Sequence, residues 1–132
     1  MTDAPRPPDG DIVTVQVPAD VMYVSTLRLT AAGLAARCEL TIDDIEDLRL
    51  AVDEACALLL PHAAGDRLDA RFVLRYARLD VQVSVDSKSD AELDTVGFAW
   101  TVLGALATSV DVVTEDARMT INFSKRRVAG VA

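Results

Sequence analysis

Cysteine, aromatic side chains and long apolar runs are scarce in this sequence, and their scarcity excludes several classes of protein. Aromatic residues make up 5% of the chain, and its two cysteines, Cys38 and Cys56, form neither a CxxC motif nor a metal-binding spacing. In a cytoplasmic protein this favours two small core residues, with a regulatory disulfide between them as the alternative. No apolar run reaches the roughly 18 residues that a membrane span needs, so we expect a globular protein.

Positive charge is the other shortage. Thirteen lysines and arginines stand against 21 aspartates and glutamates, which gives a net charge of −8. Because an acidic surface repels the phosphate backbone of nucleic acids, we expect no direct DNA or RNA binding and a basic protein as the better-suited partner. The one basic cluster, SKRR at 124–127, is predicted to be the solvated end of the last strand.

One domain is predicted over residues 11–127. A chain of 132 residues is long enough for a single core that hides about two-thirds of the surface exposed by the unfolded chain. Residues 1–10 contain three prolines and are predicted to be a disordered tail, with a second short tail at 128–132. Since the start of the chain lacks the basic and apolar stretches of a signal peptide, we expect a cytoplasmic location.

The hydrophobic pattern predicts eight elements in the order β-α-α-β-β-α-β-β. Strands are predicted at 11–19, 67–78, 79–87, 111–116 and 117–126, with a hairpin near Arg78–Asp80 and another closing the chain. Helices are predicted from Asp20 to about Arg37, from Thr41 to near Pro61, and over 96–110, where an almost wholly apolar sequence indicates heavy burial. This mixture predicts a two-layer α+β sandwich, with the helices on one face of a mixed, mostly antiparallel sheet.

Both long helices carry start signals and an apolar face. Asp20 is placed to cap the first helix, and Thr41 forms a variant capping box with Asp44 at the start of the second. The predicted buried positions are Val21, Val24, Leu27, Ala31, Leu34 and Ala35 on the first helix, and Ile42, Ile45, Leu48, Val52, Cys56 and Leu59 on the second.

Two carboxylates interrupt the apolar helical run LRLAVDEACALLLPHAA at 48–64. Because Asp53 and Glu54 are adjacent, they point about 100° apart on a helix and cannot form a paired acid–base device. A solvated or hydrogen-bonded surface pair is one interpretation. The other places one acid at the edge of the apolar stripe and its neighbour near the cleft between helix and sheet.

This run and the order of the elements resemble the anti-sigma-factor serine kinases of sporulation and general stress responses. That family belongs to the superfamily of histidine kinases, gyrase and Hsp90-like ATPases with the Bergerat ATP-binding fold, and the similarity is greatest to its actinobacterial stress branch. The resemblance covers roughly residues 11–126. Within it, Glu54 matches the glutamate that activates the reacting hydroxyl or water, and Ala55, Cys56 and His62 also fit the family's helix.

Two further positions match the family's nucleotide-binding boxes. Asp86 ends a predicted strand where the family has the aspartate that hydrogen-bonds the adenine amino group, although a turn-forming aspartate beside Ser87 gives the same pattern. Gly97 is what remains of the second glycine box. The resemblance therefore implies Glu54 as a vestigial catalytic base, and Asp86 and Gly97 as nucleotide-binding positions.

Three departures from the family pattern argue against phosphoryl transfer. The family's Mg²⁺-binding asparagine is replaced by Leu58, which offers no oxygen ligand. The first glycine box has SKSD at 87–90 in place of its glycines, and only about ten residues, three of them acidic, form the lid segment before Gly97. We therefore expect no cofactor, and Phe98 and Trp100 either fill the space that ATP would occupy or are ordinary core aromatics.

A sigma-binding role needs no nucleotide chemistry. In the family a dimer seats the sigma factor across the first helix and the start of the second, and Arg28 falls where the family has a sigma-contacting arginine. An arginine grips a carboxylate with two hydrogen bonds, although a solvent-facing helix arginine gives the same pattern. Met22 and Tyr23 would add apolar contacts to such a partner.

Acidic side chains gather at the start of the second helix. They are Asp43, Asp44, Glu46 and Asp47. Either they face basic residues of a sigma factor, or they complement the positive end of the helix dipole and form a solvated face.

The sequence thus predicts an anti-sigma factor that sequesters an alternative sigma factor and forms a homodimer. Release would come from an anti-anti-sigma protein of the STAS type, or from a redox or other signal. Two alternatives remain open at this point. One is an active serine kinase that uses ATP and Mg²⁺ to phosphorylate the anti-anti-sigma protein, and the other is a non-catalytic signalling or dimerisation module.

Overall fold

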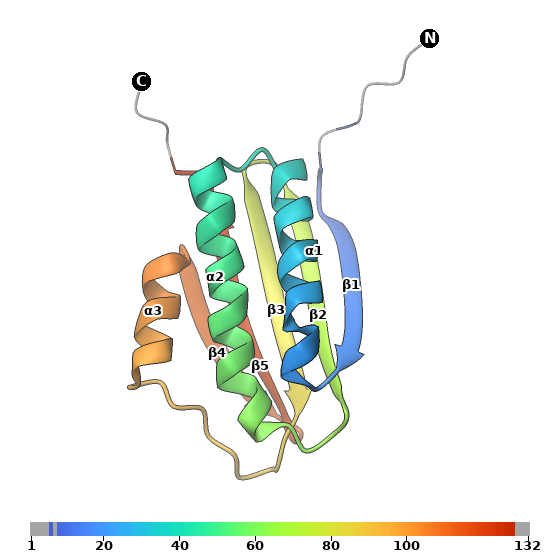
Figure 1. Ribbon diagram of the computed structural model, residues 1–132, viewed down its shortest axis with the longest axis vertical. Helices are drawn as coiled ribbons and strands as arrows, with labels where there is room; N and C mark the ends of the chain where they lie inside the picture. The colour runs from blue at the N-terminus through green and yellow to red at the C-terminus, as the bar shows by residue number, and fades with distance from the viewer. Residues whose placement is uncertain (1–5, 7, 129–132) are drawn as a thin grey trace.

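The computed structural model describes residues 6 and 8–128, and it has one sheet with helices packed against it (Figure 1). The expected tails at 1–10 and 128–132 lie mostly outside the described residues. The order of the regular elements is the predicted one, apart from two short 3₁₀ turns at Val21–Tyr23 and Leu60–His62.

Five strands form the sheet in the order β1-β2-β3-β5-β4. They are β1 (Asp11–Pro18), β2 (Arg67–Arg75), β3 (Arg78–Asp86), β4 (Ser109–Glu115) and β5 (Arg118–Arg126). Every pairing among these strands is antiparallel, so the prediction of a mixed sheet is wrong for the described part of the chain. The reason is that β4 and β5 form a hairpin, and β5, the second strand of that hairpin, pairs with β3 in place of β4.

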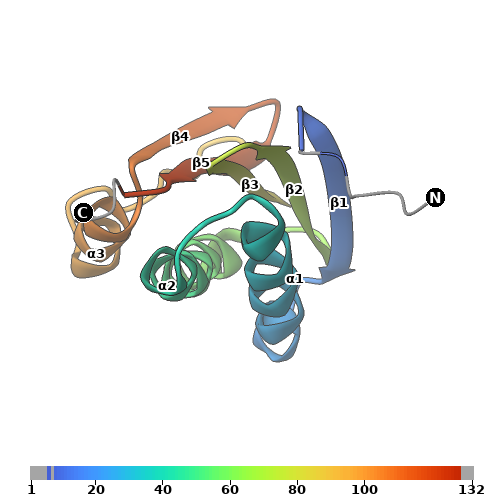
Figure 2. The same ribbon diagram turned by 90° about the horizontal axis from the view of Figure 1, so that it is seen from above.

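All helices lie on one face of the sheet, as Figure 2 shows. Helices α1 (Val24–Arg37) and α2 (Ile42–Leu59) lie side by side across it, and α3 (Phe98–Leu106) packs against α2 near β4. The predicted two-layer α+β architecture is therefore confirmed.

The predicted helix starts are confirmed in atomic detail. The Asp20 carboxylate accepts a hydrogen bond from the backbone N–H of Met22 at 2.9 Å and so caps the 3₁₀ turn that leads into α1. The Thr41 hydroxyl accepts from the Asp44 N–H at 3.1 Å, and the Asp44 carboxylate accepts from the Thr41 N–H at 3.2 Å. This reciprocal pair satisfies two backbone donors that the first turn of α2 would otherwise leave unpaired.

The core lies between the helices and the inward side of the sheet. Alternate residues of the central strands point into it: Leu68, Ala70, Phe72 and Leu74 from β2, Leu79, Val81, Val83 and Val85 from β3, and Met119, Ile121 and Phe123 from β5. Most predicted helix positions face them, but Val21 and Ile42 are exposed. Val21 lies in the 3₁₀ turn before α1, and Ile42 is the first residue of α2, so the packed face of neither helix has begun there.

The third helix departs most from expectation. It covers nine residues rather than the predicted 96–110, and Leu103 is its one fully buried side chain. Phe98 is 83% exposed, so it does not fill a nucleotide space, whereas Trp100 packs partly against the core. The apolar composition of α3 predicted more burial than the helix has. The reason is that α3 contacts the rest of the protein mainly through α2, and this contact covers only one side of α3.

The first hairpin turns two residues earlier than predicted. The turn falls at Tyr76–Ala77 rather than Arg78–Asp80, and Ala77 has a φ of 59°. A two-residue hairpin turn needs a residue in this left-handed conformation, and an alanine gives no sequence signal for it. As a consequence Tyr76 is exposed at the tip instead of continuing the buried side of β2.

Lys125 corrects the prediction of a solvated basic strand end. It is 7% exposed, because it continues the inward-facing alternation of Met119, Ile121 and Phe123 along β5. Its ammonium group donates to the Asp47 carboxylate of α2 at 3.1 Å and to the Leu106 carbonyl at the end of α3 at 2.9 Å. One buried charge therefore ties together a strand and two helices.

Both cysteines are buried and free, as the core interpretation predicted. Burial raises the pKa of the Cys56 thiol to about 12, and burial likewise raises the pKa of Cys38. Since the thiolate is the reactive form, neither side chain is poised for thiol chemistry near neutral pH. Across the described residues, no helix has both the length and the apolar character needed to cross a bilayer.

Replacing Lys125 by methionine tests its bridging role. Lys125→Met leaves the Leu106 carbonyl without its donor and Asp47 without its cation, so we expect a loss of about 1–3 kcal/mol in the free energy of unfolding. Urea denaturation measures this loss. Arg126→Met is the matched control, because Arg126 is exposed at the end of β5, and it should change stability by less than about 0.5 kcal/mol. Equal losses in both variants would contradict the assignment.

Candidate functional site

An ion pair between the two long helices explains one of the two carboxylates in the apolar run. Arg28 of α1 donates through Nη1 to the Asp53 carboxylate of α2 at 2.8 Å, and each side chain is about one-third exposed. The predicted partner-contacting arginine is thus present at the surface but held by Asp53. Asp53 is the surface hydrogen-bonding acid that the sequence allowed.

A mainly apolar hollow of about 280 Å³ lies beside this ion pair. Its lining comes from the start of α1, the end of α2 and the 3₁₀ turns next to them: Val21, Val24, Ser25, Arg28, Asp53, Ala57 and Leu60. The neighbouring Met22 is 77% exposed, and Tyr23 is also exposed. We call this region the α1–α2 surface, which consists of the hollow, its ion pair, Met22 and Tyr23. It brings together three of the predicted partner-binding residues.

The acids at the start of α2 do not act as one group. Asp44 is 2% exposed, and its carboxylate accepts from the N–H groups of Thr41 and Val128. Its predicted place on a partner-facing surface is therefore wrong, because capping takes the side chain inward. Asp47 is paired with Lys125, and Glu46 is paired with Arg49. Asp43 is the exposed acid that remains of the predicted set.

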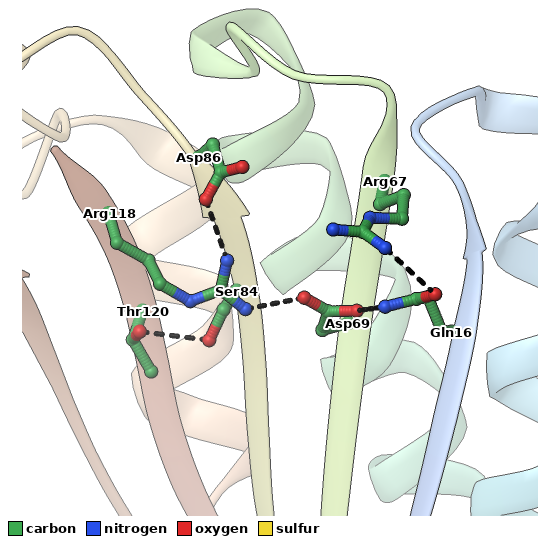
Figure 3. A network of polar contacts seen from close by, with 7 residues as sticks. All are labelled: Gln16, Arg67, Asp69, Ser84, Asp86, Arg118 and Thr120. Atoms are coloured by element: carbon green, nitrogen blue, oxygen red, sulfur yellow. Dashed lines mark hydrogen bonds and ion pairs between the residues drawn. The ribbon is translucent and has the colours of Figure 1, made fainter.

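The two main nucleotide positions lie on opposite sides of the sheet. Glu54 is half-buried on α2, within the helical layer, and it lines none of five well-formed cavities in the described part of the chain. Asp86 ends β3, where strand alternation and its partner Arg118 place its carboxylate on the outward face (Figure 3). Leu58 packs against the core one turn beyond Glu54.

Gly97 is the N-cap residue of α3 and lies close to the Asp94 side chain. A Cβ atom at this position would come within 2.3 Å of the Asp94 carboxylate, which accepts a hydrogen bond from the Val96 N–H at 3.1 Å. Asp94, one of the three acids of the short lid segment, is exposed, so its side chain would have to turn away to admit a larger residue at position 97.

Sequence reasoning missed a polar network on the outward face of the sheet, which Figure 3 shows. Arg118 of β5 donates to Asp86 at 2.9 Å and to Asp69 of β2 at 2.5 Å, and Asp69 also accepts from Gln16 of β1 at 2.8 Å. Partial burial by itself raises the pKa of Asp69, but the hydrogen bonds from Arg118 and Gln16 outweigh it and hold that pKa below its ordinary value. The signal available in the sequence was the polar residue at every second position of these alternating strands.

Comparison with known proteins is consistent with this fold. The family described as histidine kinase-like ATPase domain matches residues 17–125. The serine-protein kinase RsbW of Bacillus velezensis is 41% identical over 78 residues, which cover 56% of this chain and 49% of the relative. The serine-protein kinase RsbW of Bacillus subtilis is 36% identical over 85 residues, which cover 61% and 53%. The chain thus spans about half the length of these curated relatives.

A solved structure shares the architecture. The RsbU and RsbW domains of a Mycobacterium tuberculosis protein align with a TM-score of 0.69 at 14% identity, over 88% of this chain and 32% of that one. At this identity the likeness concerns the fold. The family match extends from β1 through β5 and includes every helix, and the chain therefore belongs to the histidine kinase-like ATPase domain family.

Proposed function

We propose that this chain is an anti-sigma factor that binds and sequesters an alternative sigma factor of a stress or developmental response. The α1–α2 surface is the observation that carries this proposal, because it places exposed apolar side chains beside a positioned arginine. Family membership and relatives named serine-protein kinase RsbW support it. A STAS-type anti-anti-sigma protein, a homodimer and a cytoplasmic location complete the proposal.

The chemistry of the α1–α2 surface suits a protein partner with an acidic and an apolar group. Asp53 occupies one edge of the Arg28 guanidinium and holds it in place, while the remaining N–H donors can bind a carboxylate of the partner. Met22 and Tyr23 lie beside the hollow and supply apolar area, which contributes most of the free energy of such contacts. Asp43 adds negative charge that mainly speeds and orients the encounter with a basic protein.

Binding without phosphoryl transfer is the form of the proposal that the residues support. Leu58 provides no oxygen where the family binds Mg²⁺, and no group of three potential metal ligands occurs among the described residues. The Asp86 carboxylate is engaged by Arg118 on the sheet face opposite the helices, away from Glu54. The residues at the nucleotide positions therefore do not fit ATP with Mg²⁺. The competing function, an active serine kinase, is favoured by the names of the relatives.

Charge reversal at Arg28 tests the partner surface. Arg28→Glu removes the donors for a carboxylate and repels it, so affinity for the cognate sigma factor should fall at least tenfold, which isothermal titration calorimetry measures. Arg28→Gln should weaken binding in the same direction without placing a second acid beside Asp53. Arg49→Glu is the control, since Arg49 lies elsewhere on α2 in an exposed pair with Glu46.

Three results would count against this surface and its partner. Unchanged binding by both Arg28 variants would remove the α1–α2 surface from the proposal. An equal loss in Arg49→Glu would assign the effect to net charge. If complexes purified from cells under many growth conditions contain no sigma factor, a signalling or dimerisation module without a sigma partner becomes the better account.

Nucleotide binding separates the anti-sigma factor from the active kinase. With about 1 mM ATP and excess Mg²⁺, we expect a change in melting temperature below about 1 °C, whereas a site with micromolar affinity would raise it by about 10 °C or more. Glu54→Ala should also leave sigma binding within about twofold, because Glu54 is not part of the α1–α2 surface. A saturable shift together with phosphate transfer to an anti-anti-sigma protein would establish the kinase instead.

A further inference from the structure

The outward face of the sheet is left uncovered by the helices (Figure 2). Two hollows lie on this face. One has a volume of about 560 Å³ and spans β1, β2, β3 and β5, and the other has about 340 Å³ and reaches β4. Arg71 and Gln82 line both hollows. These two side chains therefore form the ridge at which the hollows meet.

On this face, side chains at matching positions of neighbouring strands form rows that run across the sheet. Two neighbouring rows differ in whether their polar side chains are hydrogen-bonded to one another. The first row contains Gln16, Asp69, Ser84 and Thr120, which are paired by register and joined by hydrogen bonds among themselves and to Arg118. The second row is again aligned by register and contains Thr14, Arg71, Gln82, Asn122 and Asp111. Within the part of the chain that the structure describes, the second row makes no side-chain hydrogen bond or ion pair, and the Asn122 Oδ1 atom is buried without a partner.

The positive charge of Arg71 is not cancelled by its neighbours. On one side Asp69 is engaged by Arg118, and on the other Asp80 is engaged by Arg75 and Arg78. Asp111 of β4 lines the same hollow, but β3 and β5 lie between its strand and that of Arg71. Because Asp69 and Asp80 already have cations, Arg71 is left to attract an external anion. The lowered pKa of Asp69 is consistent with its being an ionised, occupied partner of Arg118.

We propose that Arg71 and Gln82 form a binding site for a small carboxylate that also carries an amide N–H. The planar guanidinium of Arg71 matches a carboxylate with two hydrogen bonds. The Gln82 amide oxygen, which lines both hollows, offers an acceptor for the N–H group, which a simple carboxylate lacks. The volumes of the hollows lie within the range of small-molecule sites. The site is separate from the α1–α2 surface, so it stands independently of sigma binding.

N-acetylglutamate is a suitable probe, because it combines carboxylates with one amide. Titration of the full chain, followed by ¹⁵N–¹H NMR, should give saturable shifts at the second row, with a dissociation constant of about 1 mM for a ligand of this size. Arg71→Gln should raise that constant at least tenfold. Arg49→Gln, which removes the same charge on the helical side, should change it less than twofold. Gln82→Leu should reduce the preference for N-acetylglutamate over glutarate, and the spectra show whether each variant is folded.

Four outcomes would overturn this proposal. The first is the absence of saturable shifts, and the second is an affinity that Arg71→Gln leaves unchanged. A third is shifts at the second row that follow protein concentration without ligand, since a second copy of the chain would then cover the face. The fourth is at least tenfold tighter binding of a hexaglutamate peptide at the same residues, which would make the site a polypeptide surface.

Discussion

The structure depends on a single constraint: alternate side chains of an antiparallel sheet point to opposite faces, and helices cover only one of them. The covered face receives the valines, leucines and phenylalanines that form the core with α1 and α2. The uncovered face must satisfy its polar groups within the sheet, and the Arg118–Asp69–Gln16 network does so for one row. Because alternation fixes which face each residue occupies, it also separates Glu54 from the carboxylate of Asp86.

Sequence reasoning recovered the elements whose signals are local. The caps at Asp20 and Thr41 require only a side chain and a backbone donor a few residues away, and both are present as expected. The period-two pattern of β3 likewise identified its buried valines. The extent and burial of α3 were missed because they depend on what packs against the helix, and the short turn at Ala77 was missed because alanine rarely adopts a positive φ.

The candidate site shows the same division. Arg28, which the family resemblance singled out, is one-third exposed on α1, and Met22 and Tyr23 are exposed in the 3₁₀ turn before that helix. The ion pair between Arg28 and Asp53 joins residues that are 25 apart in the sequence, and the ion pair between Lys125 and Asp47 joins residues that are 78 apart. No single-sequence pattern reports such distant pairings. The family residues were found by resemblance, but whether they meet in space was decided by the topology.

The buried ammonium of Lys125 has a mechanical consequence for the segment that follows β3. It fastens the last carbonyl of α3 to β5 and α2, whereas residues 87–97 at the other end of this segment run as irregular backbone across the bottom of Figure 1. The segment is held at its near end as well, because Ser87 is buried and its N–H donates to the Ala117 carbonyl at 2.8 Å. Its far anchor at Leu106 depends on a charge located in the sheet rather than on the segment itself.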